Sequence, residues 1–530
     1  MNTPAGRPAS SGVCIRMREE TRKKNIRTIG VMMALTLLGK VLGLARDLQL
    51  GHRLATGMEA DAFLAASRIP RNFFDAVFAS AISASFIPVF NMYLEKKGKA
   101  EAFRLSSAFI TVISIATLGF SALGMAFSPQ ITGFLADGFE GEAAQLCSSL
   151  LRILFPTVFF TGAAFSIVGI LQSLGEFNIP ALLSTASNAV IIAYFFLLFG
   201  RFGVFGLAWA FLAGWAVQVL MQLPSLRRFG YSYRPSLRHE GLSAIWKLML
   251  PVLVSTWMQP VNLTAAAKFA SRIEGGASSL EYANTLYTIV TGVFVLSIAN
   301  VIFPELSRLS AHGDGASIGE AAGQTLREML FILIPMSAGL FALAEPLIRL
   351  LYEWGDWGPD STALTAGALA WLSLGMTGYG IQVILSRLYY AMQEGRLPLV
   401  SGAVSVAVNI ALCALLWSRA GISGLAASLA LSTAAGAAVL LTAYLRRFGG
   451  SGRSGAVDII KMLAASAVMT ASVIACAGMT AGFSDGLAGR TLKVLVPTIA
   501  GAAVYFVCAL LLKIDTFRQL LGLFRKRKND

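Results

Sequence analysis

Apolar residues along the chain are gathered into runs of about 20 residues or more, separated by short polar connections. A run of this length spans the hydrocarbon core of a bilayer when it forms an α-helix. The pattern therefore predicts an all-α polytopic membrane protein with about 14 transmembrane helices. We place them at 29–50, 62–92, 104–128, 149–173, 180–200, 204–224, 244–270, 279–305, 325–351, 362–388, 397–418, 422–445, 456–482 and 489–513.

Charges in the connections alternate in sign from one connection to the next. Acidic residues mark ADGFEGEA (136–143) and YEWGDWGPD (352–360). Because basic residues stay on the cytoplasmic side, we expect both termini and the even-numbered connections to be cytoplasmic, with the first span retained rather than cleaved. The basic stretches that support this topology are RKKNIR (22–27), EKKGK (95–99), RRFGYSYRPSLR (227–238), RRFGGSGR (446–453) and RKRK (525–528).

An internal repeat organises the chain. GILQSLGEFNIPAL (169–182) matches YYAMQEGRLPLV (389–400) in pattern, and Pro398 follows Pro180 by 218 positions. The other matches are FGLAWAF (205–211) with SGLAASL (423–429), LRRFG (226–230) with its copy at 445–449, and FIPVF (86–90) with IFPEL (302–306).

The repeat predicts two six-helix lobes related by a pseudo-two-fold axis along the membrane normal, since six is even and both copies keep one topology. This arrangement is typical of transporters that rock two lobes, although a rigid scaffold is an alternative. The predicted parts are a disordered basic cytoplasmic tail (1–24), an N-terminal lobe (25–243), a C-terminal lobe (244–453), and helices 13 and 14 with a basic tail (454–530).

Composition agrees with a membrane protein and excludes several kinds of site. Only 13% of residues are charged and the mean hydropathy is +0.68, whereas soluble proteins are about 25% charged. The net charge of +15 follows from the cytoplasmic connections, so we expect no nucleic-acid partner. The three histidines and five cysteines show no metal-binding spacing, and no phosphate-binding or nucleophile motif is present, so no cofactor is predicted.

Several charges lie inside or beside the predicted spans. A charge at bilayer mid-depth costs roughly 2.5–3.5 kcal/mol, so such a side chain usually faces a cavity or a partner. Arg68, Arg71 and Asp75 share one helical stripe at i, i+3 and i+7. The full set of candidate binding residues is Lys40, Arg46, Asp61, Arg68, Arg71, Lys268 and Arg272.

Simpler explanations exist for some of these side chains. Arg46 and Arg272 could snorkel to the headgroups, and Arg71 could pair with Asp75 one turn later. Lys40 and Arg68 lie well inside their spans, which favours a positively charged cavity for an anionic cargo. Arginine and lysine together suit phosphate or diphosphate.

The motifs GKVLGLARD (39–47) and GMEADAF (57–63) open a series that resembles the MurJ (MviN) family of lipid II flippases. That family belongs to the multidrug/oligosaccharidyl-lipid/polysaccharide exporter superfamily. The resemblance covers about residues 30–450, in order and at the expected spans. Its further motifs are GILQSLGEFNIPA (169–181), IFPELSR (302–308), LYEWG (351–355) and YYAMQEGRLP (389–398).

The resemblance implies that Arg46 and Asp61 match the family directly and that Lys40 replaces an arginine. Two regions depart from the family pattern. Phe73, Phe74, Asp75, Ser80 and Ala81 stand where it has an arginine pair and Glu-Gly, and Asn284, Thr285 and Thr288 stand where it has Asp-Arg and a later Glu.

From the resemblance we expect a flippase, not an enzyme, in the cytoplasmic membrane. It would move a polyprenyl-diphosphate-linked peptidoglycan precursor, lipid II, from the inner to the outer leaflet by alternating access. Alternatives are export of another lipid-linked oligosaccharide or a small molecule, and a membrane glycosyltransferase. The expected partners are lipid II and membrane lipids, with cell-wall synthesis proteins as further candidates, and the expected state is a monomer.

Overall fold

The computed structural model of the protein describes residues 10–68, 70–71, 76–311, 315–449 and 452–518. Every regular element in these ranges is a helix. The helices form two compact units, each described here by itself. The first unit comprises residues 1–49, 70–126 and 152–253, and the second comprises 50–69, 127–151 and 254–530.

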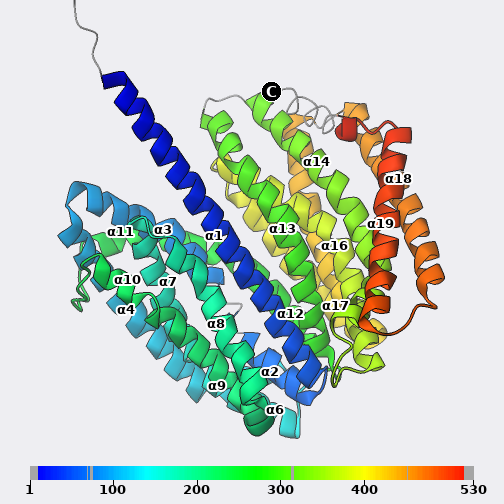
Figure 1. Ribbon diagram of the computed structural model, residues 1–530, viewed down its shortest axis with the longest axis horizontal. Coiled ribbons are helices and arrows are strands. Elements are labelled where there is room, and N and C mark those ends of the chain that lie inside the picture. Colours follow the sequence, from blue (N-terminus) through cyan, green and yellow to red (C-terminus); the bar gives the residue numbers. More distant parts are fainter. Residues whose placement is uncertain (1–9, 69, 72–75, 312–314, 450–451, 519–530) are drawn as a thin grey trace, which may run out of the picture. The chain divides into compact units, whose positions relative to one another are not determined.

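The first unit is built around an aromatic and aliphatic core in which α3, α4 and α7 pack together and α8 lies beside α9 (Figure 1). Phe86 stacks on Phe109 with ring centroids 4.6 Å apart. Its helices are α1 (Ser10–Leu54, as far as Gln49), α3 (Ala76–Lys96), α4 (Lys99–Ala126), α7 (Thr157–Ser173), α8 (Asn178–Leu197), α9 (Phe199–Leu220), α10 (Leu223–Arg228) and α11 (Gly241–Thr256, as far as Leu253).

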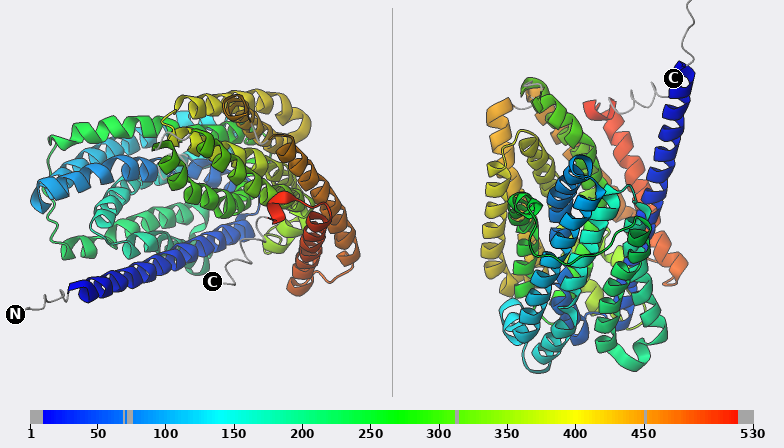
Figure 2. Two further views of the ribbon diagram at one scale, coloured as in Figure 1. Left: turned by 90° about the horizontal axis from the view of Figure 1, so that it is seen from above. Right: turned by 90° about the vertical axis from the view of Figure 1, so that its left-hand side faces the viewer.

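The second unit has two apolar cores. One lies among α13, α14, α16 and α17, and the other joins α14 to the C-terminal pair α18 and α19, which run side by side in Figure 2. Tyr505 of α19 donates a hydrogen bond to the carbonyl oxygen of Phe331 at 2.8 Å. Its helices are α2 (Met58–Arg68), α5 (Ser128–Leu135), α6 (Gly141–Leu154, as far as Leu151), α12 (Met258–Ala270), α13 (Gly276–Ala311), α14 (Gly315–Ala342), α15 (Ala344–Leu351), α16 (Pro359–Ala391), α17 (Arg396–Phe448), α18 (Gly452–Thr480) and α19 (Leu487–Leu511).

Ten helices among the described residues are long and apolar enough to cross a membrane. The all-helical, polytopic membrane class is therefore confirmed. The ten are fewer than the fourteen spans expected from sequence, because α1 and the shorter helices α2, α3, α11 and α12 are not among them and α17 counts once.

Helix boundaries differ from the sequence expectations at two places near the N-terminus. Helix α1 begins at Ser10, inside the segment 1–24 that was expected to be a disordered tail. The expected span 62–92 is covered by α2, which ends at Arg68, and α3, which begins at Ala76, with Pro70 and Arg71 in a π-helical turn between them. The basic stretch at 525–528 lies outside the described residues.

The backbone repeats its irregularities at the spacing of the sequence repeat. Gly203 adopts φ 51° and ψ −144°, and Gly421, 218 positions later, adopts φ 55° and ψ −140°. Only glycine reaches this region without strain, so each bends its helix at the same step. A second pair is formed by the helix ends after α7 and α16: the amide of Glu176 donates to Leu171 O, and that of Glu394 to Tyr389 O, both at 2.8 Å.

Candidate functional site

Arg46 lies on α1 and is held by polar and aromatic groups of the first unit. Its Nη2 contacts Asp47 Oδ1 at 2.7 Å, and its Nη1 donates to Asn188 Oδ1 on α8 at 3.0 Å. Asn188 also donates from Nδ2 to the carbonyl oxygen of Gly39 at 3.1 Å. The ring of Phe211 lies 5.4 Å from the guanidinium carbon. Arg46 is thus fixed in place by neighbours from α1, α8 and α9.

The other two basic candidates of the first unit are less enclosed. Lys40 is exposed and makes no ion pair with any residue the structure describes. Arg71 is half-buried and lies between the end of α2 at Arg68 and the start of α3 at Ala76. The predicted stripe of Arg68, Arg71 and Asp75 therefore does not follow one described helix, and Asp75 itself lies outside the described residues.

Asp61 is buried on α2 and accepts two hydrogen bonds from the start of α13. Its Oδ1 lies 2.7 Å from the backbone nitrogen of Ser278 and 2.6 Å from Ser278 Oγ. The first N–H groups of a helix have no partner within the helix, and its N-terminus attracts negative charge. Asp61 therefore caps α13 from another helix, with Ser278 as its hydrogen-bond donor.

Arg68 forms a buried ion pair seven residues further along α2. Its Nη2 lies 3.1 Å from Oε2 of Glu281, and both side chains are almost fully buried. Glu281 follows Ser278 by three residues on α13, so α2 and α13 are joined by two polar contacts on one face of each helix. The contact is a single hydrogen bond, because Nε of Arg68 has no partner among the described residues.

Arg68 also lines a small cavity in the second unit. The cavity has a volume of about 20 Å³, and Thr264, Thr132 and Cys147 line it together with Arg68. The hydroxyl of Thr264 is also buried and without a hydrogen bond among the described residues. A cavity of this volume has room for about one water molecule, so a larger ligand does not fit in this conformation.

Lys268 and Arg272 are paired with Asp137, in the loop between α5 and α6. Arg272 donates to Asp137 twice, from Nε to Oδ1 at 3.1 Å and from Nη2 to Oδ2 at 2.7 Å. Lys268 Nζ lies 3.6 Å from Asp137 Oδ2. The amide of Gly138 donates to Ser271 Oγ at 3.2 Å. The hydrogen bonds from Arg272 hold the pKa of the Asp137 carboxyl below its usual range. The loop is therefore fastened to the C-terminal end of α12.

Sequence reasoning missed the acidic partners of three basic candidates. Glu281 pairs with Arg68, and Asp137 pairs with both Arg272 and Lys268. Glu281 could have been found, because it lies in a long apolar segment where any charge requires a partner. Asp137 was used only as a sign of topology.

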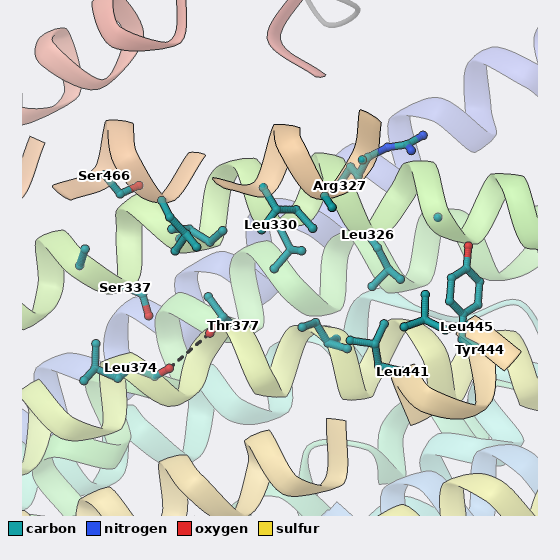
Figure 3. Close-up of a pocket in the computed structure, with 18 of the residues that line it drawn as sticks. Leu326, Arg327, Leu330, Ser337, Leu374, Thr377, Leu441, Tyr444, Leu445 and Ser466 are labelled. Atoms are coloured by element: carbon teal, nitrogen blue, oxygen red, sulfur yellow. Dashed lines mark hydrogen bonds between the residues drawn. The ribbon is translucent and has the colours of Figure 1, made fainter. Parts of the chain in front are cut away.

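The second unit also contains a long apolar groove of about 850 Å³ between α14, α16, α17 and α18. Figure 3 shows leucine side chains of three of these helices facing the groove, with Arg327 and Tyr444 among the few polar groups. Its lining includes Leu326, Leu330, Ile334, Leu374, Ile381, Leu441, Ile459 and Leu463. The groove therefore suits a hydrocarbon chain better than a polar ligand.

Comparison with known proteins gives consistent matches over most of the chain. A relative from Vibrio cholerae, described as a probable lipid II flippase MurJ, is 30% identical over 522 residues, which cover 94% of this chain and 98% of that protein. A relative from Rhizobium meliloti with the same description is 28% identical over 502 residues, covering 92% and 93%.

Solved structures agree with these matches. The structure titled "Lipid II flippase MurJ, inward closed conformation" has a TM-score of 0.76 at 25% identity and covers 92% of this chain and 99% of its own. An inward-facing multidrug resistance MATE family transporter shares the fold with a TM-score of 0.65 at 16% identity, covering 79% of this chain and 98% of its own. The sequence profile described as "Lipid II flippase MurJ" matches residues 50–496. This chain belongs to the MurJ lipid II flippase family.

Proposed function

We propose that this protein moves lipid II, a polyprenyl-diphosphate-linked peptidoglycan precursor, from the inner to the outer leaflet of the cytoplasmic membrane. Family membership supports a transporter, which makes and breaks no bond in its cargo. The observation that carries the choice of an anionic cargo is the placement of Arg68, a buried arginine on α2. A buried cation is costly, and an arginine suits a diphosphate because its planar donors match the phosphate oxygens.

The candidate residues divide into two roles under this proposal. We assign four basic groups to binding the diphosphate: Lys40 and Arg46 on α1, Arg68 at the end of α2, and Arg71 between α2 and α3. The remaining candidates are Asp61, which holds α2 against α13, and Lys268 and Arg272, which hold the α5–α6 loop against the end of α12. We assign these three residues to stabilising the closed conformation of the transporter.

The apolar groove gives the polyprenyl tail a place inside the second unit. Its leucine-rich lining and length favour an extended isoprenoid chain, since burial stabilises apolar surface by about 25 cal/mol per Å². Replacing Leu330 by Trp should narrow the groove and slow transport of long-chain precursors more than transport of short-chain analogues. Equal slowing of both would argue against a tail site.

We propose fourteen crossings, with both termini in the cytoplasm. Four crossings are added to the ten long helices in this count. They are α1, α2 together with α3, α11 together with α12, and the second half of α17 after the bend at Gly421. The repeated backbone bends support two six-helix lobes (25–243 and 244–453) with α18 and α19 added. Cysteine placed at Gly141 should be labelled from outside, and cysteine at Ser236 only after permeabilisation. The reverse labelling would contradict this topology.

The decisive experiment for the function is complementation of a flippase-depleted cell. Expression of this chain should restore both growth and the accessibility of lipid II at the outer face of the membrane. Restored growth without accessible lipid II would favour export of another lipid-linked oligosaccharide. A membrane glycosyltransferase would instead make polymer from purified lipid II, and we expect none.

A further inference from the structure

We infer that Glu281 is an internal competitor of the cargo: its carboxylate occupies Arg68 when no diphosphate is bound and is displaced when the diphosphate arrives. The inference rests on the proposed function and assigns a role to a residue outside the candidate set. It starts from a difference between two arginine–carboxylate pairs of the second unit, Arg68 with Glu281 and Arg272 with Asp137.

The first step concerns the strength of the two pairs. Arg272 donates to Asp137 from both Nε and Nη2, at 3.1 and 2.7 Å, which is the paired geometry typical of a stable arginine–carboxylate contact. Arg68 donates to Glu281 from Nη2 alone, at 3.1 Å, and its Nε makes no hydrogen bond among the described residues. The buried pair is therefore the less complete one, although an unsatisfied buried donor is costly.

The second step concerns what can replace Glu281. A buried arginine needs a negative partner, because an uncompensated charge in a site without water is strongly unfavourable. A diphosphate offers several oxygens and can accept from Nη2 and Nε together, whereas Glu281 accepts from Nη2 only. Exchange of one anion for the other leaves Arg68 paired both before and after the exchange, and it gains a hydrogen bond at Nε.

The third step concerns access. The cavity that Arg68 lines has a volume of about 20 Å³, so a diphosphate reaches Arg68 only after α2 and α13 separate. Separation breaks the contact between Arg68 and Glu281 and also that between Asp61 and Ser278. When the diphosphate leaves, Glu281 forms its ion pair with Arg68 again. A competitor of this kind weakens cargo binding and speeds cargo release.

The test compares two carboxylate variants with a matched control. Glu281→Gln keeps the size and an acceptor oxygen but removes the charge, and Glu281→Asp keeps the charge but shortens the side chain. Glu274→Gln makes the same charge change seven residues earlier, at an exposed position. Purified variants are assayed for binding of undecaprenyl diphosphate and, in vesicles, for the rate of lipid II transport.

Glu281→Gln should bind undecaprenyl diphosphate about tenfold more tightly than the unmodified protein, because a charge-assisted contact no longer competes. Its transport should be slower at saturating lipid II, since release is delayed. Glu281→Asp should bind a few-fold more tightly, and it decides the question if Glu281→Gln does not fold. Glu274→Gln should change neither quantity.

Unchanged or weaker binding in the folded Glu281 variants would overturn the inference, since a carboxylate that merely stabilises Arg68 would support binding. The proposed function fails separately, if the unmodified protein binds undecaprenyl diphosphate no better than the uncharged polyprenol. A preference for the diphosphate together with unaltered binding in the Glu281 variants would remove the competitor role alone.

Discussion

Removing the carboxylate of Asp61 should destabilise the contact between α2 and α13 by an amount that the structure lets us estimate. One oxygen, Oδ1, accepts from the backbone and the hydroxyl of Ser278, at 2.7 and 2.6 Å, and both residues are buried. A hydrogen bond to a charged group contributes about 1.5–3 kcal/mol. Asp61→Ala loses both and leaves the amide of Ser278 without an acceptor, so we expect a loss of about 3–5 kcal/mol in unfolding free energy. Asp61→Asn retains an acceptor oxygen and should lose about 1 kcal/mol.

The assay is thermal unfolding of the detergent-solubilised protein, followed by tryptophan fluorescence, with lipid II transport measured in parallel. A double-mutant cycle with Ser278→Ala isolates the coupling, which should be about 1–2 kcal/mol for neighbours that share a hydrogen bond. Ser279→Ala is the matched control, because that hydroxyl is buried without a hydrogen bond among the described residues. Equal losses for Asp61→Asn and Asp61→Ala, or no coupling to Ser278, would refute the capping role.

Three further predictions concern single residues. Asp137→Asn should weaken the attachment of the α5–α6 loop by about 0.5–1 kcal/mol. Because the pKa of Asp137 is lowered, the stabilisation from its pair with Arg272 should be complete above about pH 4 and should disappear only as the pH falls further. Unfolding free energy measured between about pH 3 and pH 7 checks this dependence. Lys40→Arg should retain transport while Lys40→Ala loses it with normal membrane insertion, and normal transport by the alanine variant would exclude Lys40 from cargo binding. Gly421→Ala should cost about 1–3 kcal/mol because of its positive φ, whereas Gly478→Ala, inside α18 with open space around it, should be neutral or stabilising in the same melting assay.

Sequence patterns were sufficient for the architecture because the signals are strong and local. Long apolar runs predict the membrane helices. The boundary expected between two spans at 418–422 coincides with the kink at Gly421, where the two helical halves of α17 meet. A single glycine can redirect a helix in this way without a connecting loop.

The candidate site was predicted less well, because pairing depends on three-dimensional proximity. The partner of Arg68 is 213 positions away and that of Asp61 is 217 positions away, so no helical spacing could connect them. Sequence reasoning found the charges that are costly in a membrane, and the alternative that it offered for Arg71, a pair with Asp75, stays a prediction because Asp75 lies outside the described residues. The sequence did not indicate that Glu281 and Asp137 form ion pairs with cations from other parts of the chain.

The contacts of Asp61 and Asp137 also constrain the order in which tertiary contacts can form during translation. Both carboxylates are made early, but Ser278 and Arg272, their partners, follow 217 and 135 residues later. A ribosome adds about 5–20 residues per second, so on the order of 10–40 s pass between the synthesis of Asp61 and that of its hydrogen-bond donor, Ser278. During that interval α2 and the α5–α6 loop have no native neighbour from α12 or α13. The nascent chain therefore depends on the insertion machinery, or on provisional contacts with its own earlier helices, to shelter these acidic groups.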